Sequence, residues 1–168
     1  VNLPADEYGQ FRLSYDGQKI VYPLYPDIWI YDIVQDIKFP VSNTGENYSP
    51  HWTSGDQLIT WTSDLDGVRK IYQKPSNGLG PKTIFIDLNG VGLGSISRNG
   101  KCAIIRKDEK IFFYDFMQNE RVMLPSTVKA TQMDLSPDGG HFLYLSDETG
   151  KNEVYVQTFP FSENRWNV

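Results

Sequence analysis

The sequence is poor in the residues that enzymes most often use for nucleophilic and metal chemistry. Among 168 residues there are one cysteine, Cys102, and two histidines, His51 and His141. A single cysteine excludes an intramolecular disulfide, and no Cys/His pair has the spacing of a zinc site. No Gly-x-Ser-x-Gly segment is present, so the nucleophile turn of an α/β-hydrolase is missing. These absences predict a chain that is not an enzyme and that uses no cofactor or metal.

Long apolar runs and basic stretches are also missing. No segment approaches the 18 apolar residues of a transmembrane helix, so direct membrane insertion is not expected. The formal net charge is −5, and no stripe of lysine and arginine could follow a phosphate backbone. Nucleic acid is therefore not an expected partner. The sequence shows no signal peptide and does not begin with Met, which predicts a mature product or an excised piece.

Four copies of one short pattern are what the sequence does contain. Each copy has a strand that ends in an apolar residue, a polar turn rich in Asp, Asn and Gly, and a second strand. The copies are FRLSYDGQKIVY from Phe11, PHWTSGDQLITW from Pro50, GSISRNGKCAII from Gly94 and MDLSPDGGHFLY from Met133. Their apolar anchors, Leu13, Trp52, Ile96 and Leu135, are 39, 44 and 39 residues apart. Self-similarity at this period indicates a repeat architecture.

Each copy continues with further strand signals, and helix-length periodic runs are absent. The second strands are predicted at 19–22, 58–61, 102–105 and 141–145, the aromatic third strands at 28–31, 71–73, 111–114 and 154–156, and the weaker fourth strands at 37–41, 83–86, 121–124 and 165–168. Four short antiparallel strands per repeat of about 40–45 residues make one propeller blade. The predicted fold is thus an all-β propeller, a single domain over 1–168 with blades at about 8–44, 45–88, 89–127 and 128–168.

The hairpins and the N-terminal residues add two details. The hairpin between the second and third strands is longer in blades two and four, which share SDLDGVRKIY at Ser63 and SDETGKNEVY at Ser146. Residues 1–4, VNLP, resemble the closing strand of blade three, VMLP at Val122. The chain would then carry a spare strand, as expected of four blades from a larger propeller. A compact four-bladed ring and half of a dimeric eight-bladed ring are the alternatives.

The turns point to a family. LSPDG at Leu135, with its variants LSYDG and ISRNG and the Asp-x-x-Gly-x-x-x-apolar-Tyr hairpin, resembles the TolB-type WD-like β-propeller repeat. The tail EVYVQTFPFSENRWNV is similar to the blade ending of extracytoplasmic propellers of bacterial receptor-type serine/threonine kinases. The resemblance implies a non-catalytic recognition or protein-interaction module, of sensor type or periplasmic. The alternative is the gating propeller of a prolyl-oligopeptidase-type or tricorn-type peptidase.

Two blades depart from the repeat. In blade two, WTSGD inverts the usual Asp-Gly order, which predicts a shifted turn geometry. In blade three, Arg98 and Asn99 replace the Pro and the Asp, and a weaker turn is expected there.

The residue before each anchor is polar in all four blades: Arg12, His51, Ser95 and Asp134. The first strand of a propeller blade lines the central channel, so equivalent positions face a shared space. We therefore expect these four side chains to lie near one channel mouth, where they would bind a protein or peptide partner or a small ligand. A water-filled channel with hydrogen bonds between blades is the alternative. A homodimer formed through exposed blade edges is a further option.

Several other features have a structural interpretation. Cys102 lies mid-strand, which predicts a small buried hydrophobe. Both histidines fit ordinary surface or interblade packing. Asp64-Leu65-Asp66-Gly67 resembles the start of a calcium loop but lacks the distal Glu, so a turn is expected. The segment 90–94, GVGLG, leads into a strand and is expected to be one, and Trp166 on the outermost strand is expected to be exposed.

Overall fold

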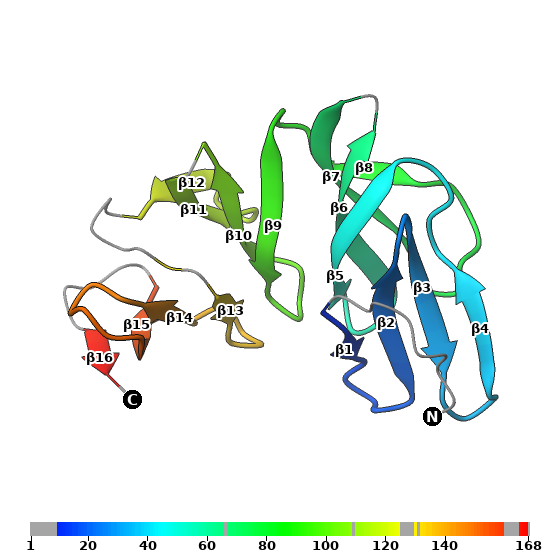
Figure 1. Cartoon of the computed structure of the whole chain (residues 1–168), viewed down its shortest axis with the longest axis horizontal. Helices are drawn as coiled ribbons and strands as arrows, with labels where there is room; N and C mark the ends of the chain where they lie inside the picture. The colour runs from blue at the N-terminus through cyan, green and yellow to red at the C-terminus, as the bar shows by residue number, and fades with distance from the viewer. Residues whose placement is uncertain are drawn as a thin grey trace. The chain divides into compact units, whose positions relative to one another are not determined.

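In the computed structural model, the described residues are 10–65, 67–108, 110–124, 130, 132–159 and 165–167, and they form strands and turns without a helix. The chain divides into two compact units, Val1–Gly92 and Leu93–Val168, each of which is described by itself. Each unit contains two four-stranded antiparallel sheets, coloured from blue to green in the first unit and from green to red in the second (Figure 1). The predicted boundaries of the single propeller domain and of its four blades stay a proposal.

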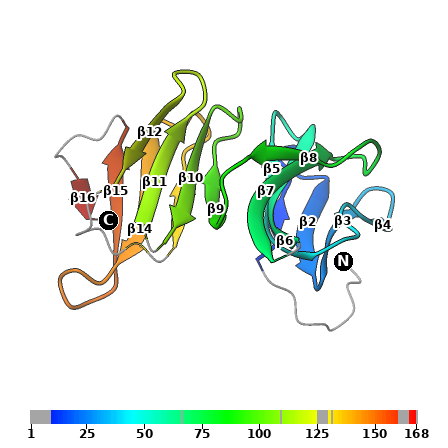
Figure 2. The same ribbon diagram turned by 90° about the horizontal axis from the view of Figure 1, so that it is seen from above.

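The first unit contains blades one and two. Blade one is built in the order β1 (Arg12–Leu13), β2 (Lys19–Leu24), β3 (Asp27–Asp32) and β4 (Ile37–Pro40). Blade two follows as β5 (Glu46–Thr53), β6 (Leu58–Leu65), β7 (Val68–Pro75) and β8 (Thr83–Ile86). Both are up-and-down sheets in which every strand pairs with its neighbour in the sequence, as Figure 2 shows from above.

The second unit repeats this arrangement in blades three and four. Blade three has β9 (Val91–Ile96), whose first two residues fall in the first unit, then β10 (Cys102–Lys107), β11 (Lys110–Asp115) and β12 (Glu120–Met123). Blade four has β13 (Met133–Leu135), β14 (His141–Ser146), β15 (Glu153–Thr158) and β16 (Arg165–Asn167). All second, third and fourth strands overlap the predicted ones, and the predicted all-β propeller fold is confirmed. The resemblance noted at residues 1–4 lies outside the described residues.

Each unit buries its own apolar core between its two sheets. In the first unit, aliphatic residues of β2 and β3 meet Trp52, Ile59, Trp61 and Tyr72 of blade two. In the second unit, residues of β10 and β11 meet Leu135, Phe142, Tyr144 and Tyr155 of blade four. The alternation of apolar and polar residues therefore places one face of each sheet against the next blade.

Candidate functional site

The turn between the first and second strands has the same hydrogen-bond network in three blades. In blade one, the Ser14 hydroxyl donates to Asp16 Oδ1 over 2.6 Å, and this oxygen also accepts the backbone N–H of Gln18 at 2.9 Å. The Ser14 Oγ in turn accepts the N–H of Lys19 at 2.8 Å. Gly17 completes the turn with φ +72°, a conformation that glycine adopts at little cost.

Blades three and four repeat these contacts with other residues. Ser136 and Asp138 form the network in blade four, with a hydroxyl-to-carboxylate distance of 2.5 Å. In blade three, Ser97 donates to Asn99 Oδ1 at 2.8 Å, and Lys101 donates its N–H to the same oxygen at 2.9 Å. An amide oxygen thus replaces the carboxylate and keeps the same contacts, and the weaker turn expected in blade three stays a prediction. The network stabilises the fold, and identical copies of it carry no information about a ligand.

The turn carboxylates have lowered pKa values. The hydrogen bond from the Ser14 hydroxyl and then that from the Gln18 N–H lower the pKa of Asp16 below its ordinary value of 3.8. The same two kinds of bond, from Ser136 and Gly140, lower the pKa of Asp138. Both groups are therefore fully ionised near neutral pH, and their oxygens are used by the turn itself.

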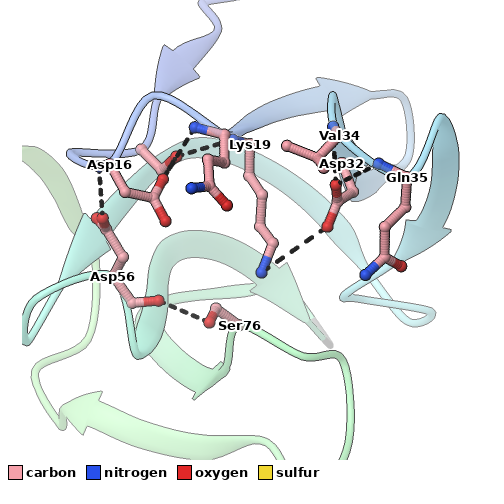
Figure 3. A network of polar contacts seen from close by, with 9 residues as sticks. Asp16, Lys19, Asp32, Val34, Gln35, Asp56 and Ser76 are labelled. Atoms are coloured by element: carbon pink, nitrogen blue, oxygen red, sulfur yellow. Dashed lines mark hydrogen bonds and ion pairs between the residues drawn. The ribbon is translucent and has the colours of Figure 1, made fainter.

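Blade two replaces this network by a contact between blades (Figure 3). Its inverted sequence gives positive φ values at Ser54, Gly55 and Asp56, so the predicted shift in turn geometry is confirmed. In this conformation Asp56 Oδ2 accepts the backbone N–H groups of Tyr15 at 2.9 Å and of Asp16 at 3.2 Å. The departure from the repeat thus fixes the turn of blade one on blade two.

A second structural carboxylate at this end was not singled out in the sequence. Asp32 Oδ1 accepts the N–H groups of Val34 at 3.0 Å and Gln35 at 2.9 Å, and Asp115 does the same in blade three for Met117 and Gln118. The Lys19 ammonium lies 4.0 Å from Asp32 Oδ2 (Figure 3). An Asp at the end of the aromatic third strand in blades one and three is the signal that could have revealed these turns.

The four polar residues before the anchors are distributed between the two units. In the second unit, the buried Ser95 hydroxyl donates to Asp134 Oδ1 over 2.5 Å, and Asp134 is exposed. In the first unit, Arg12 is partly buried and His51 is buried. The Trp52 indole N–H donates to the Arg12 carbonyl oxygen at 2.9 Å, and His51 Nδ1 lies 3.0 Å from the Ser49 carbonyl oxygen. Two of the four are thus in direct contact, while a common channel mouth stays a prediction.

The hairpin end of blade two has a different character, because no other blade repeats its contacts among the described residues. Asn47 is buried there, and its Oδ1 accepts the indole N–H of Trp61 at 2.8 Å. Its Nδ2 donates to the carbonyl oxygens of Pro26 at 2.9 Å, Thr44 at 3.1 Å and Gly45 at 2.9 Å. Asn47 therefore ties the hairpin of blade one and the connecting loop to the core of blade two.

A pocket of about 280 Å³ opens at this end of blade two. It is lined by Leu65, Val68, Lys70, Tyr72 and Asn89. Leu65 pairs with Val68 across β6 and β7, and Lys70 and Tyr72 follow on the same face of β7 at a spacing of two. The walls are therefore apolar and aromatic, with one ammonium and one amide group among them.

One lysine lines the pocket, and a second lies against the ring of Tyr72, one of its lining residues. The Lys70 ammonium lies 2.7 Å from Asp87 Oδ1, and this bond raises the pKa of Lys70. The Lys82 ammonium lies 4.5 Å from the centre of the Tyr72 ring, which places a second positive charge beside an aromatic wall. The Lys70 pair is exposed on its Asp87 side, so an incoming carboxylate could compete with Asp87 for the ammonium.

Cys102, the GVGLG segment, Trp166 and the two histidines have the structural roles that were expected. Cys102 is buried, and desolvation raises the pKa of its thiol. The GVGLG segment forms the start of β9, and 51% of Trp166 is exposed. His51 is buried and His141 is exposed. The calcium-like segment runs through a hairpin in which Asp66 lies outside the described residues, and the described part of the chain contains no group of three potential metal ligands.

Comparisons with known proteins give no relative by sequence but clear likeness by structure. No family model and no curated protein matches the chain. A TolB-type protein from Agrobacterium tumefaciens matches 96% of this chain with a TM-score of 0.77 and 18% identity, and TolB from Acinetobacter baumannii matches 96% with 0.78 and 19%. The tricorn protease matches 95% of this chain with a TM-score of 0.68 and 15% identity. The resemblance to TolB-type blades is confirmed at the level of the fold.

The chain spans only part of each matched protein: 61% of the Agrobacterium protein, 43% of the Acinetobacter protein and 16% of the tricorn protease. At such low identity the likeness extends to the fold alone. Among the described residues, no helix is long and apolar enough to cross a membrane.

Proposed function

We propose that the chain is a non-catalytic recognition module that binds a protein or peptide partner, in a sensor-type or periplasmic propeller of an extracytoplasmic compartment. The observation that carries this proposal is the pocket at the hairpin end of blade two. It lies on the sheet of blade two, and its lining combines apolar and aromatic side chains with an ammonium and an amide group, which could orient a bound partner. The fold shared with TolB proteins supports the proposal.

The chemistry of the pocket defines the partner group it would take. Its volume of about 280 Å³ suits one or two side chains of a partner. Val68 and Leu65 would contact an aliphatic or aromatic side chain, while the Lys70 ammonium would bind a neighbouring carboxylate in place of Asp87. The partner motif is thus an apolar residue next to an acidic one.

The polar residues of the first strands form a second proposed surface for the same function. The Asp134 carboxylate is exposed and is held by the Ser95 hydroxyl, so it is preorganised to accept a hydrogen bond from a partner. In the first unit, Arg12 on β1 is proposed to donate hydrogen bonds to a partner, and His51 on β5, which is 3% exposed, is proposed to belong to the same surface. An extended segment that reaches β13 would contact Asp134, and a segment that reaches β1 would contact Arg12.

Selection of a phage-displayed random peptide library on the purified chain tests the proposal. The enriched peptides should carry an acidic residue beside an apolar one. Val68→Asp should reduce their affinity at least tenfold, because the substitution places a carboxylate in the apolar wall. Thr149→Ala, which alters the long hairpin of blade four, is the matched control and should bind like the wild type.

The outcome also separates the two surfaces. Loss of binding in Asp134→Ala, with binding retained in Val68→Asp, would move the site to the first strands. Failure to enrich any peptide, or equal binding by all variants, would contradict the proposed recognition function.

A second candidate is a propeller that gates access to a peptidase, and the tricorn protease match favours it. The first-strand residues would then filter substrates. The sequence of the native gene on both sides of this segment distinguishes the two candidates. A downstream α/β-hydrolase domain with a nucleophile elbow would support the gate, whereas an upstream kinase domain and one membrane span would support the sensor.

A further inference from the structure

Blade four presents a row of apolar side chains to solvent. Leu143 pairs with Val156, and Val156 pairs with Trp166, so the three residues lie side by side on one face of β14, β15 and β16. Leu143 is 43% exposed and Trp166 is 51% exposed. We call Leu143, Val156 and Trp166 the blade-four row. Such a contiguous exposed row on a sheet face is unusual for a surface that faces only water.

The equivalent row is buried in blade one. Val21, Ile30 and Phe39 pair across β2, β3 and β4 in the same register relative to the anchor as the blade-four row. Val21 and Ile30 are fully buried, and they pack with Phe39 against Trp52 and Trp61 of blade two. The row of blade one therefore inserts into the next blade.

Blade three uses the first two residues of its row in the same way, while the third, Val122, is 38% exposed. Ile104 pairs with Phe113, and both are fully buried in a cluster with Phe142 and Tyr144 of blade four. In both described blade pairs, this row is therefore the surface that packs on a following blade. By continuity with these interfaces, the blade-four row is built to pack on a blade as well.

Blade one presents the opposite surface. In each unit, the row of the first blade packs against the apolar anchor of the second blade. This anchor is buried in both units, because Trp52 is 3% exposed and Leu135 is 8% exposed. Leu13, the equivalent anchor of blade one, is 56% exposed. Its neighbour across the strands, Ile20, is only partly buried, although the equivalent Ile59 and Phe142 are fully buried. Blade one therefore carries a receiving face, made of Leu13 and Ile20, that the described residues leave partly exposed.

We propose that these two faces bind one another between copies of the chain. The blade-four row of one copy would then pack on the receiving face, Leu13 and Ile20, of a second copy. The occupant is a second copy because the chain itself supplies both complementary halves of the interface. The contact is head-to-tail, since two different patches meet. A single blade face is smaller than the surface of about 800 Å² per partner that stable complexes bury. We therefore expect association at about 10–100 μM, the weak end of the affinity scale.

Sedimentation velocity of the wild type and two charge variants tests this proposal. The wild type should associate as its concentration rises through the micromolar range. Leu143→Arg removes the inserting row and Leu13→Arg removes the receiving face, and each variant alone should lose association at least tenfold. Both residues are exposed, so the sheet should tolerate the substitutions. Met117→Arg, at a turn residue that is 69% exposed, is the control and should associate like the wild type.

Mixing the two variants gives the decisive result. Each keeps one intact face, so an equimolar mixture of Leu143→Arg and Leu13→Arg should form a one-to-one complex although neither variant associates alone. If Leu143→Arg loses its β-sheet circular dichroism, Trp166→Ala replaces it. A wild type that is monomeric at 200 μM would overturn the proposal, as would association that survives either substitution. A mixture that stays monomeric would overturn the head-to-tail geometry.

Discussion

Replacement of Asn47 by alanine should be among the most damaging single substitutions in the first unit. Asn47 is 2% exposed, and its side chain accepts one hydrogen bond from Trp61 and donates to the carbonyl oxygens of three residues. Because an amide nitrogen has two hydrogens, these three contacts count as two bonds. The substitution leaves the buried Trp61 N–H without an acceptor, which costs about 1–3 kcal/mol, and removes two bonds of about 1 kcal/mol each. The expected loss in the free energy of unfolding is about 3–5 kcal/mol.

Urea denaturation followed by tryptophan fluorescence measures this loss. Three of the four tryptophans, Trp29, Trp52 and Trp61, lie in the first unit, so the signal reports mainly on that unit. Asn43→Ala is the matched control, because Asn43 lies in the same connecting loop and is exposed. It should change the unfolding free energy by less than about 0.5 kcal/mol.

A double-mutant cycle with Trp61→Phe tests the cause. The two substitutions remove the same bond, so their effects should fall short of additivity by about 1–2 kcal/mol. A cost below about 1 kcal/mol for Asn47→Ala, or full additivity in the cycle, would refute this account of the buried amide.

Three further outcomes follow from the turns and the thiol. Gly139→Ala should destabilise the chain more than Gly17→Ala in thermal melts, because both positions have positive φ but only the Gly139 methyl would lie 3.1 Å from the Cys102 sulfur. The melting temperature should fall as the pH drops below about 3.8. The pKa values of Asp16 and Asp138 are lowered in the folded chain, so the stability they contribute is present above that pH and is lost as the two carboxylates are protonated. The double variant Asp16→Asn, Asp138→Asn should show a smaller fall in melting temperature. The buried Cys102 should react with Ellman's reagent only in denaturant, and rapid labelling of the native chain would contradict its burial.

The strands and turns were predictable because their causes are local. The spacing of the anchors and the Ser-x-Asp-Gly turns fix where each strand begins, and the side chains that close a turn lie within five residues of one another. Even the equivalence of Ser95 and Asp134 could be anticipated from the repeat, and the structure joins them by a hydrogen bond. Residues at equivalent positions of a repeat can be compared directly from the sequence.

The contacts that distinguish one blade from another were not predictable, because they join residues that are distant in the sequence. Asp56 lies about forty residues from the N–H groups that it accepts, and the inverted Gly-Asp order only signalled a changed turn. No feature of the sequence around Asn47 marked it as a core residue, yet its amide is buried. The burial of His51 and the exposure of Leu13 likewise depend on neighbouring blades, which a pattern of apolar residues does not specify.

The distribution of these contacts separates scaffold from function. The turn networks recur in blades one, three and four in the same pattern, with an Asn oxygen in place of the Asp oxygen in blade three, so they stabilise the turns and select no ligand. Specificity must come from features that occur once. Among the described residues, the Asn47 contacts and the Lys70 pocket are found at the hairpin end of blade two, and the exposed row of Leu143, Val156 and Trp166 is found in blade four. These surfaces, rather than the repeated turns, are therefore where substitutions should change what the protein binds while leaving its fold intact.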